Sequence, residues 1–261
     1  MQRFFGFCIY RIEARKFMKN SVWKYSFLIA ILVLISCNKK DEHSLGAFRI
    51  NIATVVLEGE NTYSLLLDNG KRLWPAASDV KYAPVNDQRV FVNYTTLSNE
   101  KDGYDHYVKI NDIWNILTKK IITLTSQNTD SIGNDPVTVN AIWVGSDYLN
   151  IDFMFNYGGV KPHAINLVDN PLSSETTPDA IDLEFRHNAY ESPNMRLYEG
   201  FVCFDLKPLQ RPDVDSVKLA IKVKDWDEEK TYNVVYRYNQ AALKNTFAET
   251  PIPVVSSNEY Y

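Results

Sequence analysis

The feature that most limits how this chain can fold is an alternation of apolar and polar residues with a period of two. Phe48, Ile50 and Ile52 alternate with polar or small residues, and similar runs recur along most of the chain. A period of two places apolar side chains on one face of a β-strand, whereas an amphipathic helix needs a period near 3.6. The sequence therefore predicts an all-β protein.

The first group of these runs predicts a small barrel over residues 47–124. Residues 63–67 and 72–74 flank Asp68-Asn69-Gly70, whose Asn-Gly pair favours the positive φ angles of a tight hairpin. Runs at 89–97 and 104–110 follow, and Asn111-Asp112 predicts the cap of a short helical turn. Four or five strands and one short helix in about 75 residues are typical of an OB-type barrel.

The second group of runs predicts an antiparallel β-sandwich over residues 137–261. Residues 125–136 precede it; they are polar, contain Gly133 and Pro136 and have no period, which favours a domain linker. Seven short runs separated by turn residues are typical of a sandwich. They lie at residues 137–144, 149–155, 164–168, 181–185, 200–206, 217–223 and 232–238.

The first 36 residues predict a signal peptide. They hold six basic residues and one acid, and the apolar run Phe27–Ile35 is nine residues long. A membrane span needs about 20 apolar residues, so this run fits the core of a signal peptide. Met18-Lys19-Asn20 begins a signal peptide of normal proportions, so Met18 is an alternative start.

Leu34-Ile35-Ser36-Cys37 resembles a bacterial lipobox. The resemblance implies that Cys37 receives a diacylglyceryl group, that the chain is cut before Cys37, and that the new amino terminus is acylated, for example with palmitate. Residues 37–46 would then be the lipidated cysteine and a polar tether. The alternative is a buried apolar helix that ends in an ordinary cysteine.

Lipidation predicts a protein attached to the outer membrane of the cell envelope, because two or three acyl chains anchor a protein firmly. Asn38 is not the aspartate that retains some lipoproteins in the inner membrane. Lys40-Asp41-Glu42 resembles a signal that sends some lipoproteins to the cell surface. Surface and periplasmic orientations both remain open.

Several short motifs resemble the NigD-like lipoproteins of Bacteroidota. They include Ile142-Trp143-Val144-Gly145, Tyr148-Leu149-Asn150-Ile151 and Arg186-His187-Asn188-Ala189. The resemblance covers about residues 48–223 and implies an amino-terminal OB domain and a carboxy-terminal β-sandwich. It also implies an association with a bacteriocin locus, and it implies no catalytic role.

Motifs of common enzyme classes are absent from the sequence, and no catalytic residue, cofactor or metal site is predicted. There is no nucleophile elbow, phosphate-binding loop, dinucleotide fingerprint or His-Glu-x-x-His motif. Cys203 is the single cysteine after Cys37, and its apolar neighbours predict a buried thiol without a disulfide. No two histidines have metal-site spacing, although folding could bring His163 and His187 together.

His187 allows two interpretations. It is in phase with Leu183 and Phe185, which predicts a buried, hydrogen-bonded histidine. Alternatively, Arg186, His187 and Asn188 end a strand at a polar binding pocket. The candidate binding residues are Asp147, Tyr148, Asn150, Arg186, His187 and Asn188.

Charge argues against nucleic acid as a partner. Removing the six basic residues and one acid of residues 1–36 from totals of 28 and 32 leaves 22 and 31, a net charge of −9. Phosphate binding needs a basic surface. Asp130-Ser131-Ile132 matches a short O-glycosylation pattern of Bacteroidota, which makes Ser131 a candidate acceptor.

Together these features predict a noncatalytic envelope lipoprotein that binds a protein or glycan partner, in a bacteriocin-related or polysaccharide-related system. The alternative is an envelope hydrolase or metal-dependent enzyme that uses His163, His187 and nearby carboxylates.

Overall fold

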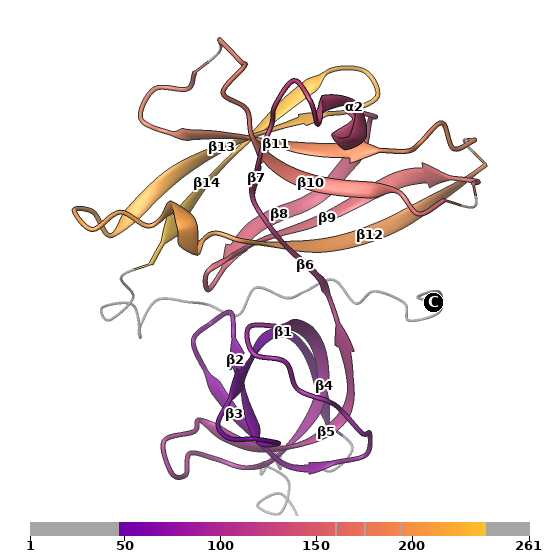
Figure 1. Cartoon of the computed structure of the whole chain (residues 1–261). Coiled ribbons are helices and arrows are strands. Elements are labelled where there is room, and N and C mark those ends of the chain that lie inside the picture. The colour runs from indigo at the N-terminus through magenta and orange to yellow at the C-terminus, as the bar shows by residue number, and fades with distance from the viewer. Residues whose placement is uncertain (1–46, 160, 175, 194, 239–261) are drawn as a thin grey trace, which may run out of the picture. The chain divides into compact units, whose positions relative to one another are not determined.

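The computed structural model describes residues 47–159, 161–174, 176–193 and 195–238. The predicted signal peptide, Cys37, the tether up to residue 46 and the segment from residue 239 onward lie outside the described residues. Nearly all regular structure is β-strand, as predicted (Figure 1). Across the described ranges, no helix is long and apolar enough to span a bilayer.

The first five strands form a closed barrel in the order β1-β2-β3-β5-β4 (Figure 1). β3 and β5 pair in parallel, and the other neighbours are antiparallel. Fully buried aliphatic side chains such as Leu65, Leu73 and Val108 fill the barrel. The strands are β1 (Phe48–Leu57), β2 (Tyr63–Leu67), β3 (Arg72–Ser78), β4 (Arg89–Ser98) and β5 (His106–Asn115).

The predicted hairpin between β2 and β3 is confirmed, and Gly70 has a φ of 82° there. The predicted helical turn after Asn111-Asp112 is wrong, because β5 continues to Asn115. The register across β4 and β5 skips Asn111, whose side chain donates hydrogen bonds to Asn93 and Thr95 at 3.0 Å each. The Asn-Asp pair thus marks a β-bulge. The extra residue of a bulge interrupts the alternation of apolar and polar residues by which a strand is recognised in the sequence.

The remaining strands form two sheets that pack as a sandwich. One sheet has the order β14-β13-β11-β10-β7, and the other has the order β6-β12-β9-β8. Leu149, Ile151 and Val202 of one sheet and Leu167 and Leu183 of the other are fully buried in the shared core. The elements are β6 (Leu117–Lys120), β7 (Ile122–Thr123), α2 (Thr129–Ile132), β8 (Thr138–Gly145), β9 (Tyr148–Tyr157), β10 (Ala164–Asp169), β11 (Ile181–Asn188), β12 (Arg196–Asp205), η1 (Lys207–Leu209), β13 (Ser216–Lys224) and β14 (Glu229–Arg237).

The structure differs from the predicted antiparallel sandwich in three pairs. The pairs β6/β12, β7/β10 and β11/β13 are parallel. β6 and β7 are short and lie at the edges of the two sheets, and the chain passes from one sheet to the other at Ile121. Ile121 packs against the sandwich core, so this crossing helps to close one side of the sandwich.

The boundary between the domains also differs from the predicted one. The sequence pattern places residues 117–123 in the barrel, but they pair with strands of the sandwich. Residues 125–136, predicted to be a linker, contain helix α2, whose Ile132 is buried with Leu124 and Val168. A polar segment without a period is compatible with a packed connection as well as with a linker, so composition alone does not separate the two.

Candidate functional site

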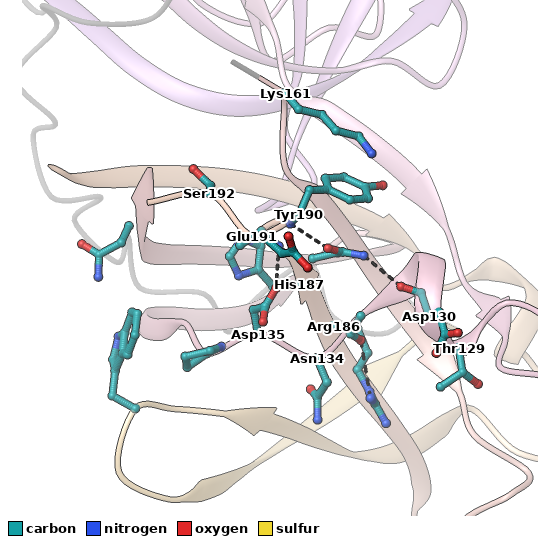
Figure 2. A pocket seen from close by; sticks show the side chains of 16 residues that line it. Thr129, Asp130, Asn134, Asp135, Lys161, Arg186, His187, Tyr190, Glu191 and Ser192 are labelled. Carbon is teal, nitrogen blue, oxygen red and sulfur yellow. Dashed lines mark hydrogen bonds between the residues drawn. The ribbon is translucent and has the colours of Figure 1, made fainter. Parts of the chain in front are cut away.

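A cavity of about 850 Å³ lies in the sandwich domain and is the candidate binding site (Figure 2). Its size is within the usual range for small-molecule pockets. Four separate parts of the chain line it: residues of the segment 129–136, Asn156 with Lys161, residues 186–192, and Trp226. These parts belong to α2 and the segment after it, to β9 and the loop after it, to the end of β11 and the loop after it, and to the β13–β14 turn.

The loop after β11 is held in an unusual backbone conformation. Tyr190 and Glu191 have φ angles of 48° and 60°, a region that side-chain-bearing residues rarely adopt. The Asn188 side chain accepts a hydrogen bond from the Tyr190 backbone N–H at 2.8 Å and donates to the carbonyls of Asp130 and Ser131 at 3.1 Å. Backbone strain of this kind tends to occur at functional sites, where surrounding contacts maintain it.

Two further contacts hold the pocket walls. The Asp135 carboxylate accepts a hydrogen bond from the Ala189 backbone N–H at 2.7 Å. The Arg186 guanidinium is paired with Glu184, with its Nε donating to Oε2 at 2.6 Å, and both side chains are about 85% buried. The arginine charge is therefore neutralised within the protein.

His187 lines the pocket and forms a pair with His163. The Nδ1 atom of His163 and the Nε2 atom of His187 are 2.7 Å apart, so one ring donates to the other. His187 is only 2% exposed, which confirms that it points into the core. Burial, and then the proximity of His163, lowers the pKa of His187 to about 4, and Asp135 acts in the opposite direction. Burial also lowers the pKa of His163, so the pair is uncharged at neutral pH.

The pocket also contains groups that sequence reasoning missed. The Lys161 ammonium lies 3.2 Å from the centroid of the Tyr190 ring, and Figure 2 shows the two side chains next to each other. Glu191 is exposed, and Trp226 is a large aromatic side chain that is 44% exposed. Trp226 follows the acidic turn residue Asp225, and an exposed aromatic residue in a polar turn is the one sequence signal that could have identified it.

The candidate binding residues do not form one cluster. Arg186, His187 and Asn188 line the pocket. Asp147, Tyr148 and Asn150 are predicted to lie beside them, but they lie elsewhere in the fold and do not line the pocket. Their strands belong to different sheets, β9 in one and β11 in the other, and sequence periodicity cannot tell which strand ends meet.

Tyr148 and Asn150 belong to the contact between the barrel and the sandwich. Arg89 of β4 is completely buried and pairs with Asp68 at 2.7 Å. It also donates a hydrogen bond to the Asn150 side chain at 3.1 Å and lies 4.9 Å from the centre of the Tyr148 ring. The apolar part of this contact includes the rings of Phe91 and Phe201, with centroids 4.9 Å apart. These polar residues thus have a structural role between domains.

Asp147 has a different structural role. Its carboxylate accepts a hydrogen bond from the Tyr236 hydroxyl at 2.7 Å, and its backbone carbonyl accepts one from the Leu206 N–H at 2.9 Å. It therefore connects the β8–β9 turn to β14 and to the segment before η1.

Cys203 is completely buried, as predicted, and its thiol donates to the Asn150 side chain at 3.0 Å. Burial raises the pKa of the Cys203 thiol to about 11, with a smaller opposing effect from Arg89. A thiol with this pKa is almost entirely protonated at neutral pH, so it is a poor nucleophile.

The described part of the chain holds no group of three or more His, Cys, Asp or Glu side chains that could bind a metal ion. Ser131 is exposed at the end of α2, and its hydroxyl donates to the Asn128 carbonyl at 2.9 Å. Its O-glycosylation stays a prediction.

Comparison with known proteins decides the family. A family model described as the NigD-like N-terminal OB domain matches residues 52–116, and one described as the NigD-like C-terminal β-sandwich domain matches residues 120–236. A solved structure from Parabacteroides distasonis, described as a candidate toxin-related protein, is 38% identical. The alignment covers 74% of this chain and 96% of that one, with a TM-score of 0.65. The chain belongs to the NigD-like family.

Two further structures share the NigD-like fold. A Bacteroides vulgatus protein of unknown function is 31% identical, with coverage of 78% of this chain and 97% of that one and a TM-score of 0.65. A NigD-like immunity protein from Bacteroides caccae is 21% identical, with coverage of 73% and 93% and a TM-score of 0.57. No curated protein matches the chain. The matched boundary, between residues 116 and 120, agrees with the strand pairing of β6.

Proposed function

We propose that this NigD-like protein is a noncatalytic lipoprotein of the cell envelope that binds an external partner through the pocket of its sandwich domain. The observation that carries the proposal is the cavity of about 850 Å³, whose walls are held by contacts within the protein. Asn188, Asp135 and Arg186 are each engaged by neighbouring residues. A pocket that is already ordered binds with a smaller entropic cost.

The envelope location follows from the sequence of the amino terminus. A basic start, a short apolar run and Leu34-Ile35-Ser36-Cys37 occur in the order that lipoprotein processing requires. Lipidation of Cys37 attaches the protein to the outer membrane, and the net charge of −9 after processing argues against nucleic acid as a partner.

The convergence of His163 and His187 is the specific observation that favours the alternative, a hydrolase or metal-dependent enzyme. Three features favour binding instead. His187 is 2% exposed, its Nε2 is engaged by His163, and its pKa of about 4 makes it a weak base at neutral pH. The described residues also provide no nucleophile activated by this pair.

A role in a bacteriocin-related system is supported by two of the similar structures. One is described as an immunity protein and one as a candidate toxin-related protein.

The proposal is tested by photo-crosslinking with the full chain in intact cells. A diazirine amino acid at Asn134, which lines the pocket, is compared with the same group at Glu100, which is exposed in the barrel. We expect a specific adduct from position 134 and none from position 100, and palmitate labelling that Cys37→Ser abolishes. Equal adducts from both positions would contradict pocket binding, and labelling that persists in Cys37→Ser would contradict the anchor.

A further inference from the structure

We propose that the ligand of this pocket is a short, uncharged saccharide that stacks on Trp226. The inference rests on the proposed function and names the chemical class of its ligand. It is carried by the charge balance of the pocket, by the kinds of polar group that line it and by one exposed aromatic side chain.

The charge balance of the lining disfavours an anionic ligand. The pocket is lined by three carboxylates, Asp130, Asp135 and Glu191, and by two cations, Lys161 and Arg186. Glu184 neutralises Arg186, whereas the Lys161 ammonium lies 3.2 Å from the centroid of the Tyr190 ring, a contact that leaves its charge in place. Three carboxylates thus outnumber the one cation of the described lining that no carboxylate pairs with, and this balance disfavours a phosphate, a sulfate or an acidic sugar.

A cationic ligand would have the exposed carboxylates of Asp130 and Glu191 as its partners among the described lining residues. The Asp135 carboxylate is engaged by the Ala189 backbone N–H. A second cation near Tyr190 would meet the positive charge of Lys161, which already occupies that ring. With neutral imidazoles and Arg186 neutralised by Glu184, the lining carries a modest negative charge, because three carboxylates oppose Lys161.

The remaining polar groups of the pocket lining are suited to hydrogen bonds with hydroxyl groups of a ligand. The side-chain amides of Asn134 and Asn156 each donate and accept hydrogen bonds, and the exposed carboxylates of Asp130 and Glu191 accept them. A sugar hydroxyl is both a donor and an acceptor, so it can pair with either kind of group. A densely hydroxylated ligand can thus use the amides and the carboxylates together.

Trp226 provides an apolar surface on the same pocket. Its side chain is 44% exposed, although its backbone is held because its N–H donates to the Asp225 carboxylate at 2.8 Å. Asp225 is 9% exposed and also accepts a hydrogen bond from the Thr138 hydroxyl at 2.9 Å. The turn therefore presents the indole to solvent on a fixed support, and an indole offers a flat apolar face with one polar N–H.

The test is a binding titration with the full chain in detergent and a panel of probes. The neutral probes are tri- to hexasaccharides of glucose, xylose, mannose and galactose; the charged probes are oligogalacturonides and chitosan oligosaccharides. We expect a neutral probe to bind at millimolar concentration or below and the charged probes to bind at least about tenfold more weakly.

Trp226→Ala is the variant that tests stacking, and Trp114→Ala is its matched control. Trp114 is also 44% exposed, but it lies on β5 of the barrel. We expect Trp226→Ala to weaken binding at least about tenfold with an unchanged melting curve, and Trp114→Ala to leave binding unchanged. Glu191→Gln should weaken binding several-fold by removing one acceptor.

Three results would overturn the saccharide proposal: tighter binding of a charged probe, equal effects of the two tryptophan variants, or no binding of any neutral probe at millimolar concentration. If no saccharide binds but position 134 crosslinks a protein in cells, the ligand class is wrong and the proposed function stands. If neither binding nor crosslinking occurs, both are wrong.

Discussion

His187 is a buried histidine whose chemical behaviour is set by its surroundings. Its ring contacts His163 and packs near Phe155, with ring centroids 5.8 Å apart. An apolar environment disfavours the charged imidazolium, and a second imidazole within hydrogen-bond distance disfavours it further. This explains why a histidine can line a pocket without acting as a base at neutral pH.

The low pKa of His187 predicts a pH-dependent stability. The unfolded chain binds a proton near pH 6.5, whereas the folded chain binds it only near pH 4. Between these values the unfolded state holds more protons, so the free energy of unfolding falls as the pH is lowered, by up to roughly 3 kcal/mol.

Denaturant unfolding at several pH values measures this effect. The His187→Gln variant keeps a polar group beside His163 but does not titrate, so we expect its stability to change less between pH 6.5 and pH 4 than that of the wild type. Carboxylates that do not interact with residue 187 contribute equally to both proteins and cancel in the comparison, whereas Asp135 and His163 leave a smaller difference because both interact with His187. Parallel stability curves for the two proteins would show that His187 is not the group responsible.

At the scale of single elements, the loop after β11 depends on close packing against the segment after α2. Gly133 has a φ of 69°, and a Cβ atom there would lie 2.7 Å from the Cβ of Asn188. Asn188 in turn holds the backbone of Tyr190. The shape of the pocket wall thus relies on the absence of a side chain at residue 133.

Gly133→Ala should therefore destabilise the protein more than a glycine substitution that strains only the backbone φ angle and causes no steric clash. Gly70→Ala is the matched control, because Gly70 has a φ of 82° but a methyl group added there would meet nothing within 4 Å. We expect a loss of about 1 kcal/mol for Gly70→Ala and about 2–3 kcal/mol for Gly133→Ala, measured by denaturant unfolding. Equal losses would show that Asn188 moves away from an added methyl group at residue 133 with little energetic cost.

The strands also show which parts of the fold can be predicted from local sequence patterns. The strands of the barrel and the seven later strands of the sandwich follow from period-two alternation, because each buries one face. The pattern places β6 and β7 in the wrong domain, because they are only four and two residues long and their partners β12 and β10 are distant in sequence. Strands of this length carry too little alternation to show which sheet they join.

At the scale of the whole described molecule, the barrel and the sandwich are joined by a buried polar contact as well as by apolar packing. Arg89 is fully buried with Asp68, and its neighbours across the contact are Asn150 and Tyr148. Gly145 is part of the same contact, because a Cβ atom there would overlap the Asp68 carboxylate.

Replacing Arg89 should therefore destabilise the protein strongly. Arg89→Met leaves the Asp68 carboxylate without its charged partner and removes one donor from Asn150, so we expect a loss of about 3 kcal/mol or more in the free energy of unfolding. Lys109→Met is the control, because Lys109 pairs with Asp79 at a similar distance of 2.7 Å but with side chains 33% and 56% exposed. Its loss should stay within about 1 kcal/mol. Similar losses in denaturant unfolding for both variants would mean that burial adds nothing to the Arg89 pair.

The sequence by itself determined the fold class, the approximate strands, the inward orientation of His187 and the buried state of Cys203. These properties depend on periodicity and residue type within a few neighbours. Only the tertiary structure decided that Asp147, Tyr148 and Asn150 lie away from Arg186, His187 and Asn188, and that Lys161 and Trp226 share a pocket with the latter group. The reason is physical: alternation specifies which face of a strand is buried, whereas the packing of distant strands and loops decides which side chains meet.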